Sequence, residues 1–286
     1  MLRIIGIVVA STLLAATVTL SLVTWNRTAS LETVVIAQQK TLAAMDARLE
    51  TARGGHGSGA DAKGSAHAAH WGYAGEMNPA KWGEAFPTCG TGKAQSPIDI
   101  RGPFDKTDQA LKLDYKPTPL KVLNNGHTIQ VNIAPGSTLT VGGETFNLLQ
   151  FHFHRPSEEL IDGKPSAMTL HFVHKSESGK LAVVGVLLNE GRTNDVIKTI
   201  WAAAPAKEGP EIEVSGAALN PALLLPAKLD YYRYDGSLTT PPCTEGVTFY
   251  ILKAPLTLGS DQVRAFPFEA NARPTMPLNG RKIYSN

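Results

Sequence analysis

The chain has 286 residues, with 26 glycines, 19 prolines and two cysteines, and its formal net charge at pH 7 is +2. A charge so close to zero gives no sign of a basic surface for nucleic acid or of a surface for acidic partners. The length allows one domain of about 200–250 residues plus an N-terminal segment, and the glycine and proline content favours strands and turns over helices.

Residues 4–24 form an apolar run without a charged side chain, between Arg3 and Arg27. About 20 apolar residues suffice for a transmembrane helix, whereas the apolar part of a cleaved signal peptide has about 7–15. We therefore predict a membrane anchor over residues 1–27, with a cleaved signal peptide as the alternative. Arg3 orients the terminus toward the cytoplasm, so the anchor would cross the inner membrane and place the rest in the periplasm or outside the cell. After cleavage the protein would be secreted.

Residues 28–53 have the pattern of a helix. Residues on one face recur at spacings of four and three, with one glutamine in the series: Leu31, Val35, Gln38, Leu42, Met45 and Leu49. This heptad pattern predicts a helical stalk, either a single amphipathic helix or a coiled coil that joins a homo-oligomer. Residues 54–69 are rich in glycine, serine, alanine and histidine and are predicted to form a flexible linker.

From residue 70 to residue 286, short apolar or alternating stretches are separated by glycine, proline and asparagine turns. Their β-branched content and period-2 alternation predict strands. The predicted strands are residues 121–123, 128–133, 138–141, 146–154, 168–174 and 181–188. Helices are predicted over residues 193–204 and from residue 260, where Ser260 begins a capping pattern. The predicted fold is a single, mainly β domain with a few peripheral helices.

Three histidines form the most informative pattern in the chain. His152 and His154 are two residues apart in a predicted strand, so their side chains point to the same face of a sheet. His171, from the next predicted strand, would complete a trigonal set of imidazoles. A catalytic zinc needs three protein ligands and an open position for water, whereas a structural zinc usually binds thiolates, and this chain has only two cysteines. The pattern therefore predicts a catalytic zinc site.

Nine sequence blocks make residues 69–286 similar to the α-class carbonic anhydrases. In chain order, the blocks are Trp71–Tyr73, Gln95–Ile100, Asn124–His127, Gln150–His154, Pro156–Glu158, His171–His174, Ser237–Pro242, Asn271–Pro274 and Pro277–Arg281. The resemblance implies a large, twisted, mostly antiparallel central sheet, Zn²⁺ on His152, His154 and His171, and reversible hydration of CO₂ to bicarbonate. Zinc would lower the pKa of bound water to about 7, as in other carbonic anhydrases, and the hydroxide would attack CO₂.

The resemblance also assigns roles to further residues. Thr239 would orient the hydroxide and donate its own proton to Glu158, because an ionised carboxylate only accepts hydrogen bonds. Thr240 would line the bicarbonate side of the site, and His127 would carry the proton out, since histidine titrates near neutrality. The apolar wall for CO₂ would consist of Val173, Val183, Leu238 and Val247, with Phe249 where the family usually has a tryptophan.

Two positions depart from the family pattern. Thr169 stands where the family has a glutamate that accepts the other N–H of the ligand corresponding to His171, and Glu159 stands where a histidine is usual. Loss of such a partner typically costs about 10–100-fold in metal affinity or activity, so the sequence predicts faster zinc loss. Gln150, Thr169 and Asn271 are the predicted residues that support the ligands.

Cys89 and Cys243 are the only cysteines. From the residues alone, the pair indicates one disulfide in an exported protein or two buried thiols in a cytosolic one. The resemblance to exported bacterial members implies a Cys89–Cys243 disulfide. It would close a loop of about 155 residues and tether the segment that carries Thr239.

The leading hypothesis is a membrane-anchored zinc lyase that interconverts CO₂ and bicarbonate. The alternative is a carbonic-anhydrase-related binding module that has lost catalysis. A missing ligand histidine would mark such a module, and none is missing here. Ester hydrolysis is expected only as a side activity of the same hydroxide.

Overall fold

The structure, a computed structural model, describes residues 70–286. The predicted anchor (1–27), stalk (28–53) and linker (54–69) lie outside the described residues, so these segments and their boundaries stay predictions. Within residues 70–286, no helix is long and apolar enough to cross a membrane.

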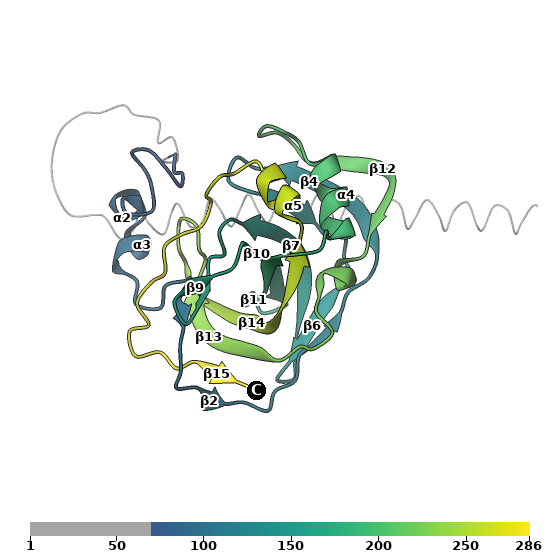
Figure 1. Cartoon of the computed structure of the whole chain (residues 1–286). Coiled ribbons are helices and arrows are strands. Elements are labelled where there is room, and N and C mark those ends of the chain that lie inside the picture. Colours follow the sequence, from purple (N-terminus) through teal and green to yellow (C-terminus); the bar gives the residue numbers. More distant parts are fainter. Residues whose placement is uncertain (1–69) are drawn as a thin grey trace, which may run out of the picture. The chain divides into compact units, whose positions relative to one another are not determined.

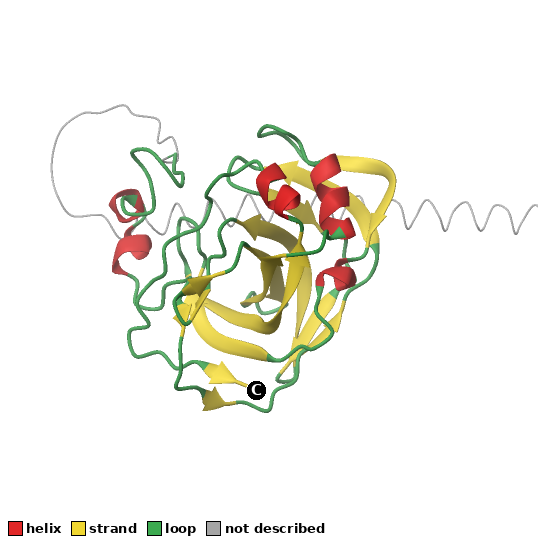
Figure 2. Ribbon diagram, in the orientation of Figure 1, coloured by secondary structure: helices red, strands yellow, loops and turns green. Residues whose placement is uncertain are grey.

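Strands form the centre of the fold, and the few helices lie at its periphery (Figure 2). The largest sheet has twelve strands. In chain order they are β2 (Asp105–Lys106), β3 (Lys112–Asp114), β4 (Thr118–Asn124), β5 (Ile129–Asn132), β6 (Thr138–Val141), β7 (Glu144–His154), β10 (Met168–Ser176), β11 (Leu181–Glu190), β12 (Ile212–Leu219), β13 (Tyr231–Ser237), β14 (Glu245–Leu258) and β15 (Tyr284–Ser285).

The large sheet is mixed, with antiparallel pairs in the majority (Figure 1). Its spatial order is β12-β4-β5-β7-β10-β11-β14-β13-β15-β2, while β6 pairs with β7 and β3 pairs with β6. Within this sheet, β11 runs parallel to β14 and β15 runs parallel to β2, and the other pairs are antiparallel. The predicted mostly antiparallel central sheet is therefore confirmed.

A second sheet of three short strands holds the turn that follows β7. Its strands are β1 (Asp99–Ile100), β8 (Leu160–Ile161) and β9 (Lys164–Pro165). Strand β1 pairs in parallel with β8, with Asp99 opposite Leu160 and Ile100 opposite Ile161. This pairing fixes the chain immediately after Glu158 and Glu159, although β1 and β8 lie about 60 residues apart in the sequence.

Within residues 70–286, five short helices lie around the sheets. They are α2 (Trp82–Ala85), α3 (Pro87–Thr91), α4 (Asp195–Ala203), the 3₁₀ helix η1 (Pro221–Leu224) and α5 (Ser260–Ala265). The predicted helices at 193–204 and 260 correspond to α4 and α5. Asn194 caps α4, because its side-chain oxygen accepts hydrogen bonds from the first free backbone N–H groups of the helix. The Trp201 indole donates to the Gln262 carbonyl at 2.9 Å and so joins α4 to α5.

Alternation along the central strands separates an apolar face from the face that carries the site. Phe151, Phe153 and Phe172 are fully buried in the main hydrophobic core. Residues between them in the sequence, such as His152, point to the opposite face because successive side chains of a strand alternate. On that opposite face lies a smaller core that includes Val183 and Phe249. The sheet therefore supports the site from below with closely packed aromatic side chains.

Candidate metal centre

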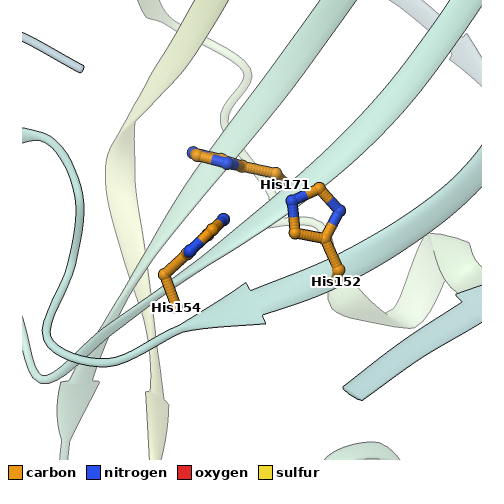
Figure 3. A group of neighbouring side chains, drawn as sticks. All are labelled: His152, His154 and His171. Carbon is orange, nitrogen blue, oxygen red and sulfur yellow. The ribbon is translucent and has the colours of Figure 1, made fainter. Parts of the chain in front are cut away.

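The three predicted ligands lie together on adjacent strands. Strands β7 and β10 pair antiparallel, with His171 opposite His152 and Thr169 opposite His154. One nitrogen of each of the three imidazoles lies within 4.8 Å of the others, and the rings point toward one another (Figure 3). The alternation of β7 and the register with β10 thus bring the three histidines to one point, as the sequence predicts.

Each imidazole uses its other nitrogen for a hydrogen bond. Nδ1 of His152 lies 2.8 Å from Oε1 of Gln150, and Nδ1 of His154 lies 2.8 Å from the backbone oxygen of Asn271. Nε2 of His171 lies 3.1 Å from both carboxylate oxygens of Glu159. These acceptors fix the rings so that Nε2 of His152, Nε2 of His154 and Nδ1 of His171 face the common point.

The donor set fits zinc. Three imidazole nitrogens with no thiolate are the ligand set of a catalytic zinc site, which keeps one position open. Nε2 of His154 is buried and makes no hydrogen bond to any described residue, which is costly unless another group occupies that position. A metal ion at the common point would satisfy this nitrogen.

Burial keeps two of the ligands neutral. It lowers the pKa of His152 to about 3, with a further decrease from His171, and it lowers the pKa of His154 well below its usual range. Burial also lowers the pKa of His171, but the carboxylates of Glu159 and Glu158 together outweigh burial, so its pKa is raised. Metal ions bind neutral imidazoles, so the first two ligands are ready to bind over the physiological pH range.

Glu158 lies beside the ligands and is completely buried. Its Oε1 accepts a hydrogen bond from the backbone N–H of Arg273 at 2.9 Å, and its Oε2 lies 3.4 Å from Nε2 of His154. Burial raises the pKa of Glu158 to about 7, and the Thr239 hydroxyl is among the groups that lower it. The predicted Glu158 and Thr239 are therefore neighbours, and Thr239 is itself buried.

The loop that carries Thr239 is held on both sides. The backbone N–H of Leu238 donates to Thr244, and that of Cys243 donates to Thr240, both at 2.9 Å. Cys243 is joined to Cys89 of α3 by a disulfide with the Cα atoms 5.0 Å apart, which confirms the predicted pairing. The disulfide thus anchors the loop just beyond the two threonines.

The predicted apolar wall lies on the same side of the sheet as the histidines. Val183 and Val247 are buried in the smaller core, and Val173 and Leu238 are partly buried against it. Phe249, the position of the family's tryptophan, is buried and meets the His171 ring edge-to-face at 6.0 Å between centroids. Thr240 is half-buried. The structure therefore places the predicted substrate residues in one neighbourhood.

His127 lies in the turn between β4 and β5. Gly126 has a φ of +83°, which favours glycine, and the Asn125 side chain accepts hydrogen bonds from the backbone N–H groups of His127 and Thr128. The turn is tied to the metal ligands through Asn271, whose side-chain amide donates to the carbonyl of His127. His127 is half-buried, and its position is fixed from both directions.

Asn271 supports the site through its backbone and its side chain together. Its carbonyl is the partner of His154, and its amide donates to the carbonyl of Phe153 at 2.9 Å. Its side-chain oxygen accepts from the backbone N–H of Arg155 at 2.7 Å. Gln150 likewise contacts His152, so both predicted supporting residues lie where the sequence places them.

The prediction that Thr169 supports His171 is wrong about the contact that Thr169 makes. The Thr169 hydroxyl accepts a hydrogen bond from the backbone N–H of Glu158 at 3.1 Å, and the acceptor beside His171 is Glu159. The physical reason is the turn after β7, which β1 and β8 hold so that the Glu159 side chain reaches His171. The glutamate at 159 was visible in the sequence as a departure from the family, but its contact depends on that distant strand pairing.

Arg273 is a structural residue of the site that the sequence patterns do not single out. Its side chain is buried, and the guanidinium donates to Gln95, to the Ser96 carbonyl and to the Cys89 carbonyl at 2.8–3.0 Å. Its backbone N–H contacts Glu158. Its place in the block Asn271–Pro274 was the only signal for it.

Comparison with known proteins agrees with this geometry. The family model for eukaryotic-type carbonic anhydrase matches residues 77–286. A carbonic anhydrase of Pectobacterium carotovorum is 45% identical over 220 residues, covering 75% of this chain and 90% of the relative. A carbonic anhydrase of Nostoc sp. is 40% identical over 224 residues, covering 75% of this chain and 85% of the relative.

Solved structures give the same result. The α-carbonic anhydrase of Photobacterium profundum has a TM-score of 0.71 and 45% identity, covering 75% of this chain and all of that one. The α-carbonic anhydrase of Thermovibrio ammonificans, solved with the inhibitor sulfanilamide, has a TM-score of 0.72 and 40% identity, covering 76% and 99%. The metal centre, the fold and these relatives agree, and the chain belongs to the eukaryotic-type (α-class) carbonic anhydrase family.

Proposed function

We propose that His152, His154 and His171 hold the Zn²⁺ with which this family member catalyses the reversible hydration of CO₂ to bicarbonate and a proton. The observation that carries the assignment is the set of three imidazole nitrogens within 4.8 Å, each on a ring whose other nitrogen has an acceptor. Zinc on three neutral imidazoles supplies a nucleophile at neutral pH, because it lowers the pKa of bound water to about 7, as in other carbonic anhydrases.

Thr239 and Glu158 are proposed to orient the nucleophile. Glu158 has one oxygen engaged by the backbone of Arg273, so its remaining acceptor capacity is available to the Thr239 hydroxyl. A hydroxyl that donates its proton to a carboxylate must accept from its other neighbour, which here is the attacking group. The fixed direction of the Thr239 hydrogen bonds supports a positioning role for both Thr239 and Glu158.

The apolar side chains Val173, Val183, Leu238 and Val247 are proposed to receive CO₂. CO₂ has no net dipole and little to gain from polar partners, so an apolar surface beside the nucleophile can hold it without strong binding. Thr240 offers a hydroxyl at the rim of this surface, where it would contact the charged product bicarbonate.

His127 is proposed to transfer the proton to solvent. It is the half-buried histidine of the turn that Asn271 ties to His154. Each hydration releases one proton, and a group that titrates near neutrality can both accept it and pass it to buffer.

The disulfide indicates that the domain folds outside the cytoplasm, because disulfides persist in oxidising compartments. The apolar run at residues 4–24 supports an anchor over 1–27 in the inner membrane, with a stalk over 28–53 and a linker over 54–69. In this proposal the domain at 70–286 faces the periplasm, and the stalk is either a single amphipathic helix or a coiled coil that joins a homo-oligomer.

Stopped-flow CO₂ hydration by the purified full-length chain, with zinc measured on the same sample, tests the proposal. We expect one zinc per chain and fast hydration, both lost in His152→Ala. Glu144→Gln, a change at a partly exposed residue at the far end of β7, is the matched control. A wild-type chain with one zinc and no hydration would contradict the catalytic assignment and favour a binding module.

A further inference from the structure

We propose that Glu159 is the positioning residue of the zinc ligand His171, and that Glu159 and Thr169 form a matched pair, in which Thr169 holds the turn that brings the carboxylate to the ring. This inference rests on the proposed zinc site. The Glu159 side chain is 0% exposed and His171 is 2% exposed, and both carboxylate oxygens lie 3.1 Å from Nε2 of His171.

Glu159 has no competing hydrogen-bond partner. Among the described residues, His171 is the one side chain or backbone group that makes a hydrogen bond to its carboxylate. Burial of a carboxylate costs free energy unless a hydrogen-bond partner replaces the water that it loses. His171 is that partner here, and the equal distances to the two oxygens show that the carboxylate meets the ring symmetrically.

Thr169 acts on the turn and not on the ligand. Its hydroxyl accepts the backbone N–H of Glu158, which is adjacent to Glu159 in the chain. The Ser157 hydroxyl donates to the Glu159 carbonyl at 2.8 Å, and the Ser157 N–H donates to the Ser166 carbonyl at 3.1 Å. A small hydroxyl residue at 169 therefore leaves room for the turn and helps to hold the Glu159 carboxylate against His171.

The chemical consequence concerns how strongly His171 binds the metal. A carboxylate at Nε2 fixes the tautomer in which Nδ1 carries the free lone pair, and it raises the basicity of that nitrogen. The other two ligands have neutral acceptors, the amide of Gln150 and the carbonyl of Asn271. Glu159 therefore provides the one carboxylate partner in the ligand set. Because Glu159 supplies the acceptor that Thr169 does not, this proposal no longer implies the faster zinc loss that the sequence predicts from Thr169.

The pairing of Glu159 with Thr169 also predicts the effect of a glutamate at position 169. Thr169 is 0% exposed and contacts the turn, so a glutamate at 169 would place a second carboxylate against Glu158 and Glu159 and displace the turn. Thr169→Glu alone should therefore weaken the site. The same change together with Glu159→His, which restores the arrangement that the family resemblance describes, should recover it. Such a sign reversal between single and double variants distinguishes direct coupling from independent damage.

Zinc release from the full-length protein into excess chelator measures the effect without using activity. We expect Glu159→Gln, which keeps the shape and removes the carboxylate, to release zinc about 10–100-fold faster than wild type. Thr169→Glu should also release zinc faster, and Glu159→His with Thr169→Glu should be slower than either single variant. Glu144→Gln, a partly exposed carboxylate at the far end of β7 that pairs with Lys180, is the matched control and should release zinc at the wild-type rate.

A measurement on the wild-type protein covers the case in which a variant does not fold. In the zinc-loaded chain, the Nε2–H proton of His171 should be protected from exchange and shifted downfield by its carboxylate acceptor in proton NMR. Wild-type zinc release in folded Glu159→Gln, slower release in Thr169→Glu alone, or a missing proton signal would each overturn the assignment while CO₂ hydration by the wild type stands. A wild-type chain that binds no zinc would overturn both this inference and the proposed function.

Discussion

The imidazole of His127 stacks on the indole of Trp71, with ring centroids 3.7 Å apart and 9° between the planes. Trp71 in turn meets Trp82 and Tyr73 edge-to-face, at 5.2 and 5.8 Å between centroids. This aromatic group connects the start of the domain to the turn that carries the proposed proton carrier. The stack gives the half-buried His127 a defined resting position, from which we expect it to exchange protons with solvent.

Replacement of His127 by alanine should separate proton transfer from the chemical step. Because His127 is proposed to act only after CO₂ has reacted, kcat should fall by about 10²-fold while kcat/KM changes little. Imidazole in the buffer should restore part of kcat by replacing the missing side chain. Stopped-flow hydration at several buffer concentrations checks this. Glu144→Gln, at the far end of β7, is the control, and an equal loss of kcat in that variant would contradict the role of His127.

The pH dependence of kcat should report the surroundings of His127. Burial lowers the pKa of His127 below its usual 6.5, His70 lowers it further, and Glu208 raises it. The carrier must be neutral to accept a proton, so kcat should rise with pH through an apparent pKa below 6.5. Glu208 lies against the Gly126 turn, where an added Cβ would come within 2.8 Å of its carboxylate. Glu208→Gln removes a charge that raises the pKa of His127, so the rise of kcat with pH should move to lower pH. A rise that stays at the same pH or moves to higher pH would show that another group controls the pH dependence of kcat.

Local patterns predicted most of what surrounds the zinc site. Residues 146–154 and 168–174 alternate or carry β-branched and aromatic side chains, and the structure has β7 and β10 there. The i and i+2 spacing of His152 and His154 was sufficient to place both on one face. The pairing with His171 followed from the short separation between the two strands, because neighbouring strands in sequence usually pair.

Other parts of the fold could not be predicted from local patterns. Strand β14 contains Pro255 and has a long run of buried residues instead of an alternation, so period-2 analysis does not detect it. Strand β13 has charged and glycine residues within it. The contact between Glu159 and His171 depends on β8, which pairs with β1 from about 60 residues earlier. The family resemblance compares residues position by position and therefore assigned the hydrogen-bond acceptor of His171 to Thr169. In the structure, the Glu159 carboxylate reaches Nε2 of His171 from another element.

His174 should control part of the acid sensitivity of the fold. Burial lowers its pKa to about 4, and its neutral ring lies between the Tyr115 hydroxyl at 2.8 Å and the Ala182 carbonyl at 3.2 Å. The unfolded chain binds a proton at this site below about pH 6.5 and the folded chain does so only below about pH 4. Stability is therefore lost as pH falls through this window, by up to about 3 kcal/mol from this group.

His174→Gln removes this titration and keeps hydrogen-bonding groups in the same space. The variant should be less stable than wild type at pH 7, and the difference in unfolding free energy should shrink as the pH falls toward 4. Urea unfolding of the zinc-free proteins at several pH values measures the difference, and zinc-free samples keep metal release out of the comparison. A difference that stays constant from pH 7 to pH 4 would assign the acid sensitivity to other groups.

The disulfide should stabilise both the domain and the loop that carries Thr239. Cys89 and Cys243 are 154 residues apart in sequence, so their link removes much of the freedom of the unfolded chain, and loss of a native disulfide typically costs about 2–5 kcal/mol. The metal ligands lie on β7 and β10 and do not depend on the loop for their positions. In Cys89→Ser with Cys243→Ser, we therefore expect a lower free energy of unfolding and a lower kcat/KM, while the zinc content of the folded protein stays unchanged. Urea unfolding, CO₂ hydration and zinc analysis of one sample separate these effects, and reduced wild type should match the double variant. Zinc loss in parallel with activity would instead mean that the disulfide holds the metal centre itself.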